Sequence, residues 1–257
     1  MERLPSLDAH CHMSQDHVSE DLARTGFAVA LTLSLEEGER AINRDEGHIL
    51  WGVGCYPRRA ASQQAFDLDI FQELAAQTAV IGEVGLDTGS SVPIELQKRN
   101  FRQILEYIAD HPRIVSIHSY RATALVLEEL RRTPIPTPKL HWWTGSAAET
   151  SKAVEIGCYF SVHSAVARHS KFRTRVPPER FLVESDHGYR DPPDAIPCRV
   201  EWVEHLIAQQ VQLTFDETRK LVWRNFLRIV QDTQTLKLLP DSFTKILTSI
   251  DRGAYGS

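Results

Sequence analysis

Short apolar runs alternate with longer segments of helical periodicity along the whole chain. The runs are rich in Val, Ile and Phe, whereas the longer segments space apolar residues three and four positions apart, with charged residues between them. Such alternation is typical of parallel strands connected by helices. We expect eight strands, at Leu7–His12, Phe27–Ser34, Ile49–Cys55, Ala79–Leu86, Ile114–His118, Lys139–Trp143, Cys158–His163 and Phe181–Asp186.

The clearest helix follows the fourth apolar run, where Phe101, Ile104, Leu105 and Ile108 repeat at helical spacing and His111-Pro112 ends the pattern. Two further stripes follow the eighth run, the first at Val203, Leu206, Ile207 and Val211 and the second at Leu221, Val222, Phe226 and Ile229. Eight strands separated by helices in 257 residues favour a closed (β/α)8 barrel in a single domain over an open doubly wound sheet.

The last segment exceeds what eight strand–helix units need, so we expect a barrel over residues 1–232 and an extension over residues 233–257. Within the extension, Phe243, Ile246, Leu247 and Ile250 repeat at helical spacing after Pro240-Asp241. Two interpretations stay open. The helix either caps the barrel's own surface or docks another protein chain.

Composition and charge narrow the classes of protein. The chain has 42% hydrophobic and 25% charged residues, a composition that is ordinary for a globular protein and excludes a disordered or fibrous one. A net charge of −5 argues against a non-specific coat protein for nucleic acid or anionic membranes, although a local basic groove is compatible with it. No apolar run approaches a membrane span, and Met1–Leu7 lacks a secretion-signal layout, so we expect a cytoplasmic protein without membrane contact. The four cysteines lack Cys-x-x-Cys spacing and are expected to be reduced, mostly buried thiols: Cys11, Cys55, Cys158 and Cys198.

The strongest local motif is Asp8-Ala9-His10-Cys11-His12 at the end of the first strand. Strand side chains alternate between faces, so His10 and His12 point the same way and can share one metal ion. The spacing alone is only moderately specific, because histidines also serve as hydrogen-bonded core residues.

Other strand ends carry metal-competent side chains as well: Glu83, His118, His141 and Asp186. A barrel gathers its carboxyl strand ends around one mouth, which favours a shared site over separate structural roles. Four imidazoles and two carboxylates exceed one tetrahedral shell but suit two ions bridged by a carboxylate. Nitrogen and oxygen ligands without thiolate indicate zinc, manganese, iron or cobalt, with magnesium less natural.

These motifs, taken in order, resemble the TatD family of metal-dependent deoxyribonucleases within the amidohydrolase-like barrels. The opening motif resembles the family's D-x-H-x-H, and Ile81–Asp87 its G-E-x-G-L-D block. The remaining matches are Gln97 and Phe101 (Q-x-x-x-F), His118-Ser119 (H-S), His141 with Gly145 (H-x-x-x-G), Val183–Asp186 (E-T-D) and Asn225-Phe226. Leu140–Ser146 and Tyr159–Ser164 look most like a short branch found with bacterial Qat phage-defence cassettes.

The resemblance implies one ion held by His10, His12, Glu83 and Asp186, and a second held by Glu83, His118 and His141, with Glu83 as the bridge. It further implies hydrolysis of phosphodiester bonds in DNA, in which Asp186 is both ligand and proton acceptor for the attacking water. Glu83 and Asp186 are therefore the expected catalytic residues.

The chain departs from the family pattern beside the expected site. Tyr56 in Gly54-Cys55-Tyr56-Pro57 stands where the family has histidine, and a phenol is a poor proton shuttle at neutral pH. Tyr120 replaces the usual arginine, with Arg121 next to it, and His187-Gly188 replaces a small residue followed by proline. Because of these departures, the sequence supports metal binding more strongly than it supports the family's contacts with substrate.

Substrate contacts are expected from loops at the barrel mouth. Tyr56, Arg58, Arg121 and His187 are candidates to hold phosphates, and Trp142 or Trp143, with Trp143 favoured, is a candidate to stack a base. Arg59 and a basic run after the seventh strand could add charge, unless the run is a solvated helix face: Arg168, His169, Lys171, Arg173 and Arg175. Local basic charge on an acidic protein favours single strands or DNA ends over long duplex.

Two other functions compete with a nuclease. One is a different hydrolase on the same barrel, acting on an amide, a lactone or a deamination substrate. Many of those use a carbamylated lysine on the fourth strand, where this chain has Glu83. The other is a structural or partner-dependent subunit of a defence complex with a degenerate metal site, docked through residues 233–257.

Overall fold

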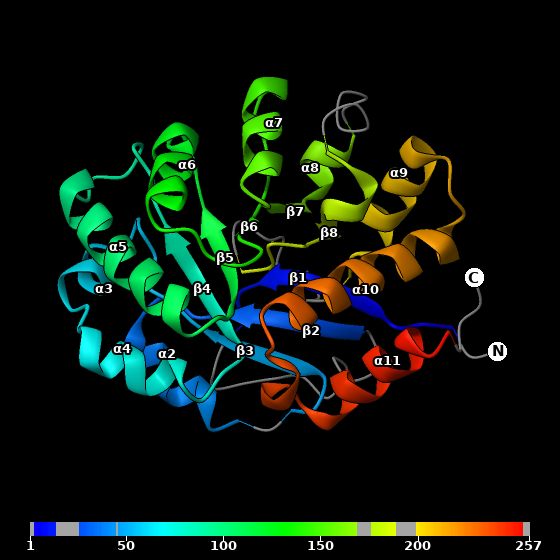
Figure 1. Ribbon diagram of the computed structural model, residues 1–257, viewed down its shortest axis with the longest axis horizontal. Coiled ribbons are helices and arrows are strands. Elements are labelled where there is room, and N and C mark those ends of the chain that lie inside the picture. Colours follow the sequence, from blue (N-terminus) through cyan, green and yellow to red (C-terminus); the bar gives the residue numbers. More distant parts are fainter. Residues whose placement is uncertain (1–2, 14–25, 45, 169–175, 189–198, 254–257) are drawn as a thin grey trace.

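The computed structural model describes residues 3–13, 26–44, 46–168, 176–188 and 199–253, and its strands confirm the predicted barrel. Eight strands pair in parallel and in chain order, and Figure 1 shows them at the centre with helices outside. The strands are β1 (Ser6–Cys11), β2 (Gly26–Leu31), β3 (Ile49–Val53), β4 (Val80–Gly85), β5 (Ile114–His118), β6 (Lys139–Leu140), β7 (Tyr159–Val162) and β8 (Phe181–Val183).

The helices cover the outside of the barrel with their apolar stripes inward. In the helix after β4, the expected stripe is buried while the charged residues between are exposed or partly exposed. Two helices begin with capping boxes, Ser146 with Glu149 and Thr214 with Glu217. The helices are α2 (Leu35–Ile42), α3 (Ala60–Gln64), α4 (Leu68–Ala75), α5 (Ile94–Asp110), α6 (Thr123–Arg132), α7 (Ala147–Glu155), α8 (Ser164–Ala167), α9 (Glu201–Val211), α10 (Phe215–Asp232) and α11 (Asp241–Asp251).

The first and last strands meet through backbone hydrogen bonds at the carboxyl end. The amide of Asp186 donates to the carbonyl of His10 over 3.0 Å, and the amide of His12 donates to the carbonyl of His187 over 2.6 Å. The carboxylate of Asp8 adds a bond from the amide of Ser185. This junction places the N-terminal histidines next to Asp186.

Several strands end earlier than their apolar patterns predict. β2 stops at Leu31 instead of Ser34, β6 at Leu140 instead of Trp143, and β8 at Val183 instead of Asp186. Beyond the end of β6, the amide of Trp142 donates to the side chain of Glu184 instead of to a neighbouring strand. Trp142 and Asp186 also take left-handed backbone angles that a strand does not allow. The chemistry-bearing residues of β6 and β8 therefore lie on loops at the mouth.

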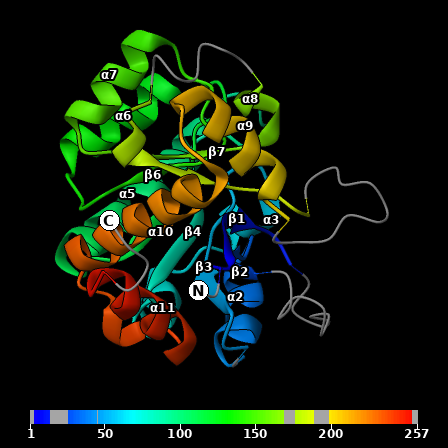
Figure 2. The same cartoon turned by 90° about the vertical axis from the view of Figure 1, so that its right-hand side faces the viewer.

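Helix α11 packs on the barrel beside α10, and Figures 1 and 2 show the two helices adjacent in both views. Phe243 and Leu247 are buried, and the ring of Phe243 lies 4.7 Å from that of Phe27 and 6.2 Å from those of Trp223 and Phe226. This packing supports the cap interpretation of the helix. A docking role for residues 233–257 stays a prediction.

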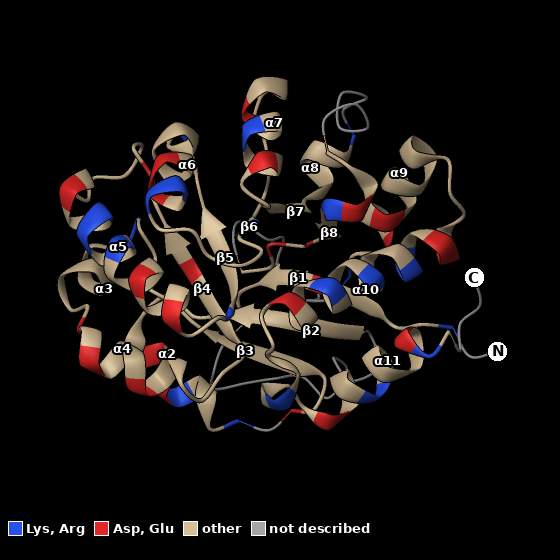
Figure 3. Cartoon of the chain, in the orientation of Figure 1, with Lys and Arg blue, Asp and Glu red and all other residues tan. Residues whose placement is uncertain are grey.

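Charges of both signs are spread over the outer helices (Figure 3). Within the described part of the chain, no helix is both long and apolar enough to cross a membrane. Cys11, Cys55 and Cys158 are buried, as expected of core thiols, and Cys198 lies outside the described residues.

Candidate metal centre

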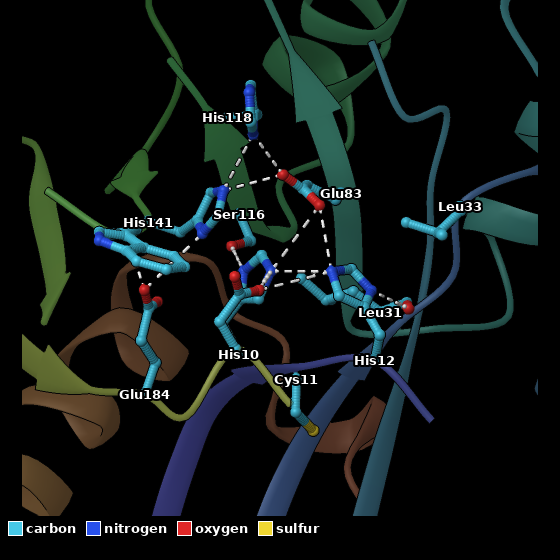
Figure 4. Close-up of polar contacts among 12 residues, drawn as sticks. His10, Cys11, His12, Leu31, Leu33, Glu83, Ser116, His118, His141 and Glu184 are labelled. Atoms are coloured by element: carbon cyan, nitrogen blue, oxygen red, sulfur yellow. Dashed lines mark hydrogen bonds and ion pairs between the residues drawn. The ribbon is translucent and has the colours of Figure 1, made fainter. Parts of the chain in front are cut away.

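The structure brings all six predicted metal ligands together at the carboxyl end of the barrel. Glu83 lies in their midst, and Figure 4 shows the four histidines around it. His12 is partly buried and the other five are buried. The six residues lie in five strands or within three residues of their ends: His10 (β1), His12 (after β1), Glu83 (β4), His118 (β5), His141 (after β6) and Asp186 (after β8).

The two oxygens of Glu83 face different pairs of histidines. Oε1 lies 2.6 Å from Nδ1 of His118 and 2.8 Å from Nε2 of His141. Oε2 lies 3.2 Å from Nε2 of His12 and 3.8 Å from Nε2 of His10. A carboxylate placed in this way can bridge two cations.

Asp186, which follows β8, lies near the two histidines at the end of the first strand. Its Oδ1 lies 3.5 Å from Nε2 of His10 and 3.7 Å from Nε2 of His12. Ligand atoms close enough to hold one ion occur in three overlapping groups: His10, His12 and Glu83; His10, His141 and Asp186; and Glu83, His118 and His141. The third group has the same residues as one ion site that the family resemblance implies, and the first contains three of the four residues implied for the other site. Asp186, the fourth, is grouped instead with His10 and His141.

Local irregularities of the strands aim the ligands inward. The pairing register shifts between Asp8 and Cys11 in β1 and between Ile81 and Val84 in β4, so both His10 and Glu83 lie within bulges. Gly82 has φ of 153°, and a Cβ there would lie 3.0 Å from that of Ser116. A glycine before Glu83 therefore allows the close approach of β4 and β5.

In His12 and His118, the ring nitrogen that points away from Glu83 makes a hydrogen bond, and this arrangement suits the binding of cations. Nδ1 of His12 donates to the carbonyl of Leu31 over 2.9 Å, and Nε2 of His118 donates to Oδ2 of Asp87 over 2.8 Å. In a neutral imidazole the other nitrogen then carries a lone pair, which here faces the Glu83 carboxylate. Lone pairs and carboxylates converging in a buried space need positive charge between them, and metal-binding histidines are held in this manner.

The remaining two histidines differ in their outer contacts, because the buried Nδ1 of His141 has no hydrogen-bond partner among the described residues. Nδ1 of His10 lies 2.8 Å from Oγ of Ser116, and Nδ1 of His141 lies 3.7 Å from Oε1 of Glu184. The rings of His10 and His141 stack with centroids 3.9 Å apart. All four imidazoles are therefore held in fixed orientations before any ion binds.

The pKa values report the charge balance of the centre without a metal ion. Burial opposes the charge on His141, but the carboxylates of Glu83 and Glu184 outweigh burial and raise its pKa to about 10. Burial likewise opposes the charge on Glu83, yet the neighbouring His141 and His118 hold its pKa well below its usual range. Burial, aided by Glu184 and Glu83, raises the pKa of Asp186 to about 7. These shifts have one cause in common: the buried carboxylate of Glu83 favours positive charge next to it.

A pocket of about 460 Å³ opens over the centre. Of the predicted substrate contacts, Tyr56, Arg58 and Arg121 line it. The ring of Tyr56 meets that of His118 edge-on, with centroids 5.5 Å apart. His187 is not among the lining residues, and it serves the β1–β8 junction through its backbone carbonyl.

The expectation for Trp143 is corrected by the structure. Trp143 is buried against Phe160, and its indole donates to Oγ1 of Thr150, whereas Trp142 lines the pocket. The alternation of a strand would decide which tryptophan faces inward, but the strand ends at Leu140. Trp142 has φ of 40°, so simple alternation no longer applies.

Only some of the basic residues predicted to contact the substrate lie among the described residues. Arg59 pairs with Glu37 of α2. Arg168 is exposed after α8, and the rest of the predicted run, His169, Lys171, Arg173 and Arg175, lies outside the described residues. Arg58 and Arg121 are the predicted arginines that line the pocket among described residues.

Sequence reasoning missed a buried layer of charged residues that supports the ligands. Asp87 holds His118, and Glu184 faces His141, accepts a hydrogen bond from Ser161 and accepts the amide of Trp142 over 2.7 Å. Lys139 is buried in β6, where it donates to the carbonyl of Ala9 over 2.6 Å, and burial lowers its pKa to about 8. The signal that pointed to Glu83, a charged residue in an apolar strand, applies equally to Lys139 and Glu184.

Known proteins resemble this chain over most of its length. The family model described as TatD related DNase matches residues 7–231. The mouse protein TATDN3 is 26% identical, over 90% of this chain and 90% of its own. The 3'-5' ssDNA/RNA exonuclease TatD of Cronobacter sakazakii is 31% identical, over 70% of this chain and 75% of its own. The crystal structure of YJJV, a TatD homolog from Escherichia coli, has the same fold, with a TM-score of 0.74, 19% identity, and coverage of 87% of this chain and 97% of that one.

Proposed function

The chain belongs to the TatD-related DNase family of metal-dependent nucleases, and we propose that it hydrolyses phosphodiester bonds of DNA at a centre of two divalent cations. The observation that carries the proposal is the division of the Glu83 oxygens between two pairs of histidines. His10, His12, Glu83 and Asp186 would hold one cation, and Glu83, His118 and His141 the other. The donor set suits zinc, manganese, iron or cobalt better than magnesium.

The chain's own residues orient and deprotonate the nucleophile. When bound, the cations would lower the pKa of water and stabilise charge on the leaving oxygen. Asp186 lies at the edge of the cluster and lines the pocket, where its carboxylate can take the proton of the attacking water. The guanidinium groups of Arg58 and Arg121 line the same pocket and hold the phosphates.

Tyr56 stands in the pocket where the family has histidine. Its phenol donates a hydrogen bond to a phosphate oxygen but does not shuttle protons at neutral pH. Proton transfer therefore falls to Asp186. This assignment differs from one in which a histidine at position 56 protonates the leaving group.

The proposed substrate is a single strand or a DNA end. A pocket of about 460 Å³ has the size of a small-molecule site and does not accommodate a paired duplex segment. The Cronobacter relative is named as an exonuclease on single-stranded DNA and RNA, which supports the same substrate class here.

The test combines metal content with cleavage. End-labelled single- and double-stranded DNA is incubated with added manganese, magnesium or zinc, using wild type, Glu83→Gln and the exposed control Glu155→Gln. We expect about two ions per wild-type chain, with cleavage lost in Glu83→Gln and retained in Glu155→Gln. Undiminished cleavage by Glu83→Gln, or no bound metal in wild type, would overturn the proposal.

The competing functions are less well supported. Glu83 occupies the place of the lysine used by many amidohydrolases, which disfavours amide, lactone or deamination substrates. A degenerate metal site is disfavoured because all six ligands converge. A role in phage defence stays a prediction of the resemblance to the Qat branch. A cytoplasmic location and docking of a partner through residues 233–257 stay predictions from the sequence pattern. Full nuclease activity of the isolated chain would contradict the need for a partner.

A further inference from the structure

Trp142 forms one side of the pocket directly beside a metal ligand. It follows His141 in the chain, is only partly buried, and lines the pocket together with Thr144. Its indole ring packs on the imidazole of His163 in a tilted arrangement, with centroids 3.9 Å apart and the ring planes 30° apart. His163 is itself held in place, because its Nδ1 accepts the amide of Ala165 at the start of α8. The indole is thus supported from behind by a second aromatic ring.

The backbone of Trp142 is fixed from below by the buried Glu184. The amide of Trp142 donates to Oε1 of Glu184 over 2.7 Å, while Oε2 of Glu184 accepts a hydrogen bond from Ser161. Trp142 has φ of 40°, a left-handed conformation that is uncommon for a bulky aromatic residue. Arg121 and Asp186, with φ of 53° and 49°, also line this pocket, and such strain collects at functional sites.

The residues that line the pocket differ in chemistry. Arg58 and Arg121 supply positive charge for phosphates, and the supported indole supplies a flat apolar face. Aromatic faces of this kind stack nucleobases, with little regard to base identity. Because Trp142 is adjacent to His141, a base on the indole belongs to a nucleotide that flanks the phosphate at the metal centre.

From this arrangement we infer that Trp142, backed by His163, is a nucleobase-stacking subsite that accepts only an unpaired base. The inference rests on the proposed phosphodiesterase function and names the part of the substrate that the same pocket recognises. A base within a duplex has both faces covered by its neighbours and must leave the stack before it can bind there. The subsite therefore selects unpaired strand ends.

The test compares two short oligothymidines that carry the same phosphates. One has a base on every sugar, and the other has abasic terminal sugars at both ends. Binding is measured with the Glu83→Gln protein, so that cleavage does not interfere, and cleavage is measured with the wild-type metal-loaded enzyme. We expect the base-bearing oligonucleotide to bind about 5- to 150-fold more tightly, the range that stacking of one base supplies.

Substitutions identify the residue that causes the difference. In the Glu83→Gln background, Trp142→Ala should remove the preference, Trp142→Phe should retain most of it, and His163→Ala should reduce it. The matched control is Trp202→Ala, which removes a tryptophan that is 56% exposed on α9. Metal content of Trp142→Ala in the otherwise wild-type chain should be unchanged, which separates loss of stacking from damage to His141.

The outcomes separate the two proposals. Equal binding of the two oligonucleotides, or an unchanged preference in Trp142→Ala, overturns the stacking subsite even if the wild type cleaves DNA. A preference that depends on Trp142, combined with no metal-dependent cleavage by wild type, supports the subsite and overturns the proposed hydrolysis.

Discussion

The histidines of the centre are positioned by residues outside the proposed set of metal ligands. Asp87 is the clearest case, because both of its oxygens are in use: Oδ2 accepts from Nε2 of His118 and Oδ1 accepts the amide of Gly89 over 2.7 Å. Gln97 in turn holds the backbone of Asp87 through its amide and carbonyl. The carboxylate therefore fixes both the orientation and the tautomer of His118.

Asp87→Asn should weaken metal binding without removing a ligand. An amide has only one acceptor oxygen, so it cannot satisfy both Gly89 and His118, and one N–H would face another. We expect metal affinity to fall about 10- to 100-fold, measured by competition with a chelator. The exposed Asp110→Asn at the end of α5 is the matched control. Equal metal retention in both variants would show that Asp87 does not position His118.

At the scale of elements, helices α5 and α6 are joined by a bidentate ion pair. Arg102 donates to both oxygens of Glu129, over 2.6 and 2.8 Å, and Glu129 is nearly fully buried while Arg102 is about one-third exposed. The hydrogen bonds from Arg102 hold the pKa of Glu129 below its ordinary value of 4.5. The folded state therefore favours the ionised carboxylate.

Glu129→Gln should destabilise the fold in a pH-dependent manner. Because the folded pKa is lowered, the stabilisation is present above about pH 4.5 and is lost as the pH falls through the folded value. We expect the free energy of unfolding by urea to drop by about 1 kcal/mol near neutral pH, since the exposed arginine is partly screened. At acidic pH, the difference in the free energy of unfolding between the variant and the wild type should become smaller. The exposed Glu128→Gln should show neither effect, and a loss that is independent of pH would contradict the ion-pair explanation.

Helix α11 is expected to be part of the folding unit of the barrel. Phe243 is fully buried among Phe27, Trp223 and Phe226, so Phe243→Ala should lower the free energy of unfolding by about 3 to 5 kcal/mol. Phe243→Leu, which leaves a smaller cavity, should cost less. A change below about 1 kcal/mol in urea denaturation would indicate that the helix is only loosely attached, as a docking segment would be.

At the scale of the whole molecule, an acidic protein must bind a polyanion through local positive charge. The net charge is −5, and Arg58 and Arg121 are on the pocket wall. Two phosphate contacts to a single strand predict a slope of roughly −1.4 when the logarithm of the binding constant is plotted against that of salt concentration. Long-range attraction of DNA by the rest of the surface is not expected.

Replacing both arginines tests this electrostatic account. In the non-cleaving Glu83→Gln background, Arg58→Gln with Arg121→Gln should flatten the salt dependence by roughly 1.4, whereas the exposed Lys245→Gln on α11 should leave it unchanged. An unaltered slope in the double variant would place the phosphate contacts elsewhere on the chain.

The sequence by itself determined the barrel and the set of candidate ligands. Strand and helix periodicities are local properties, and charged residues at the ends of apolar strands, such as Glu83 and His118, stand out because burying them requires a partner. The order of the strands then brings their carboxyl ends to one mouth, so the grouping of the ligands follows from the fold class.

Only the tertiary structure decided how these residues face one another. The bulges at His10 and Glu83 and the left-handed angle of Trp142 arise where strands meet loops, and there the simple alternation of side chains fails. Alternation allows only one of the two tryptophans at the pocket; the sequence favoured Trp143, and the fold placed Trp142 there. The supporting roles of Asp87 and Glu184 depend on contacts between residues 23 to 42 positions apart, which no local pattern encodes. The local sequence pattern thus determined which residues can serve as ligands. Long-range packing determined how their side chains are oriented, because neighbouring strands set the direction of each side chain at the barrel mouth.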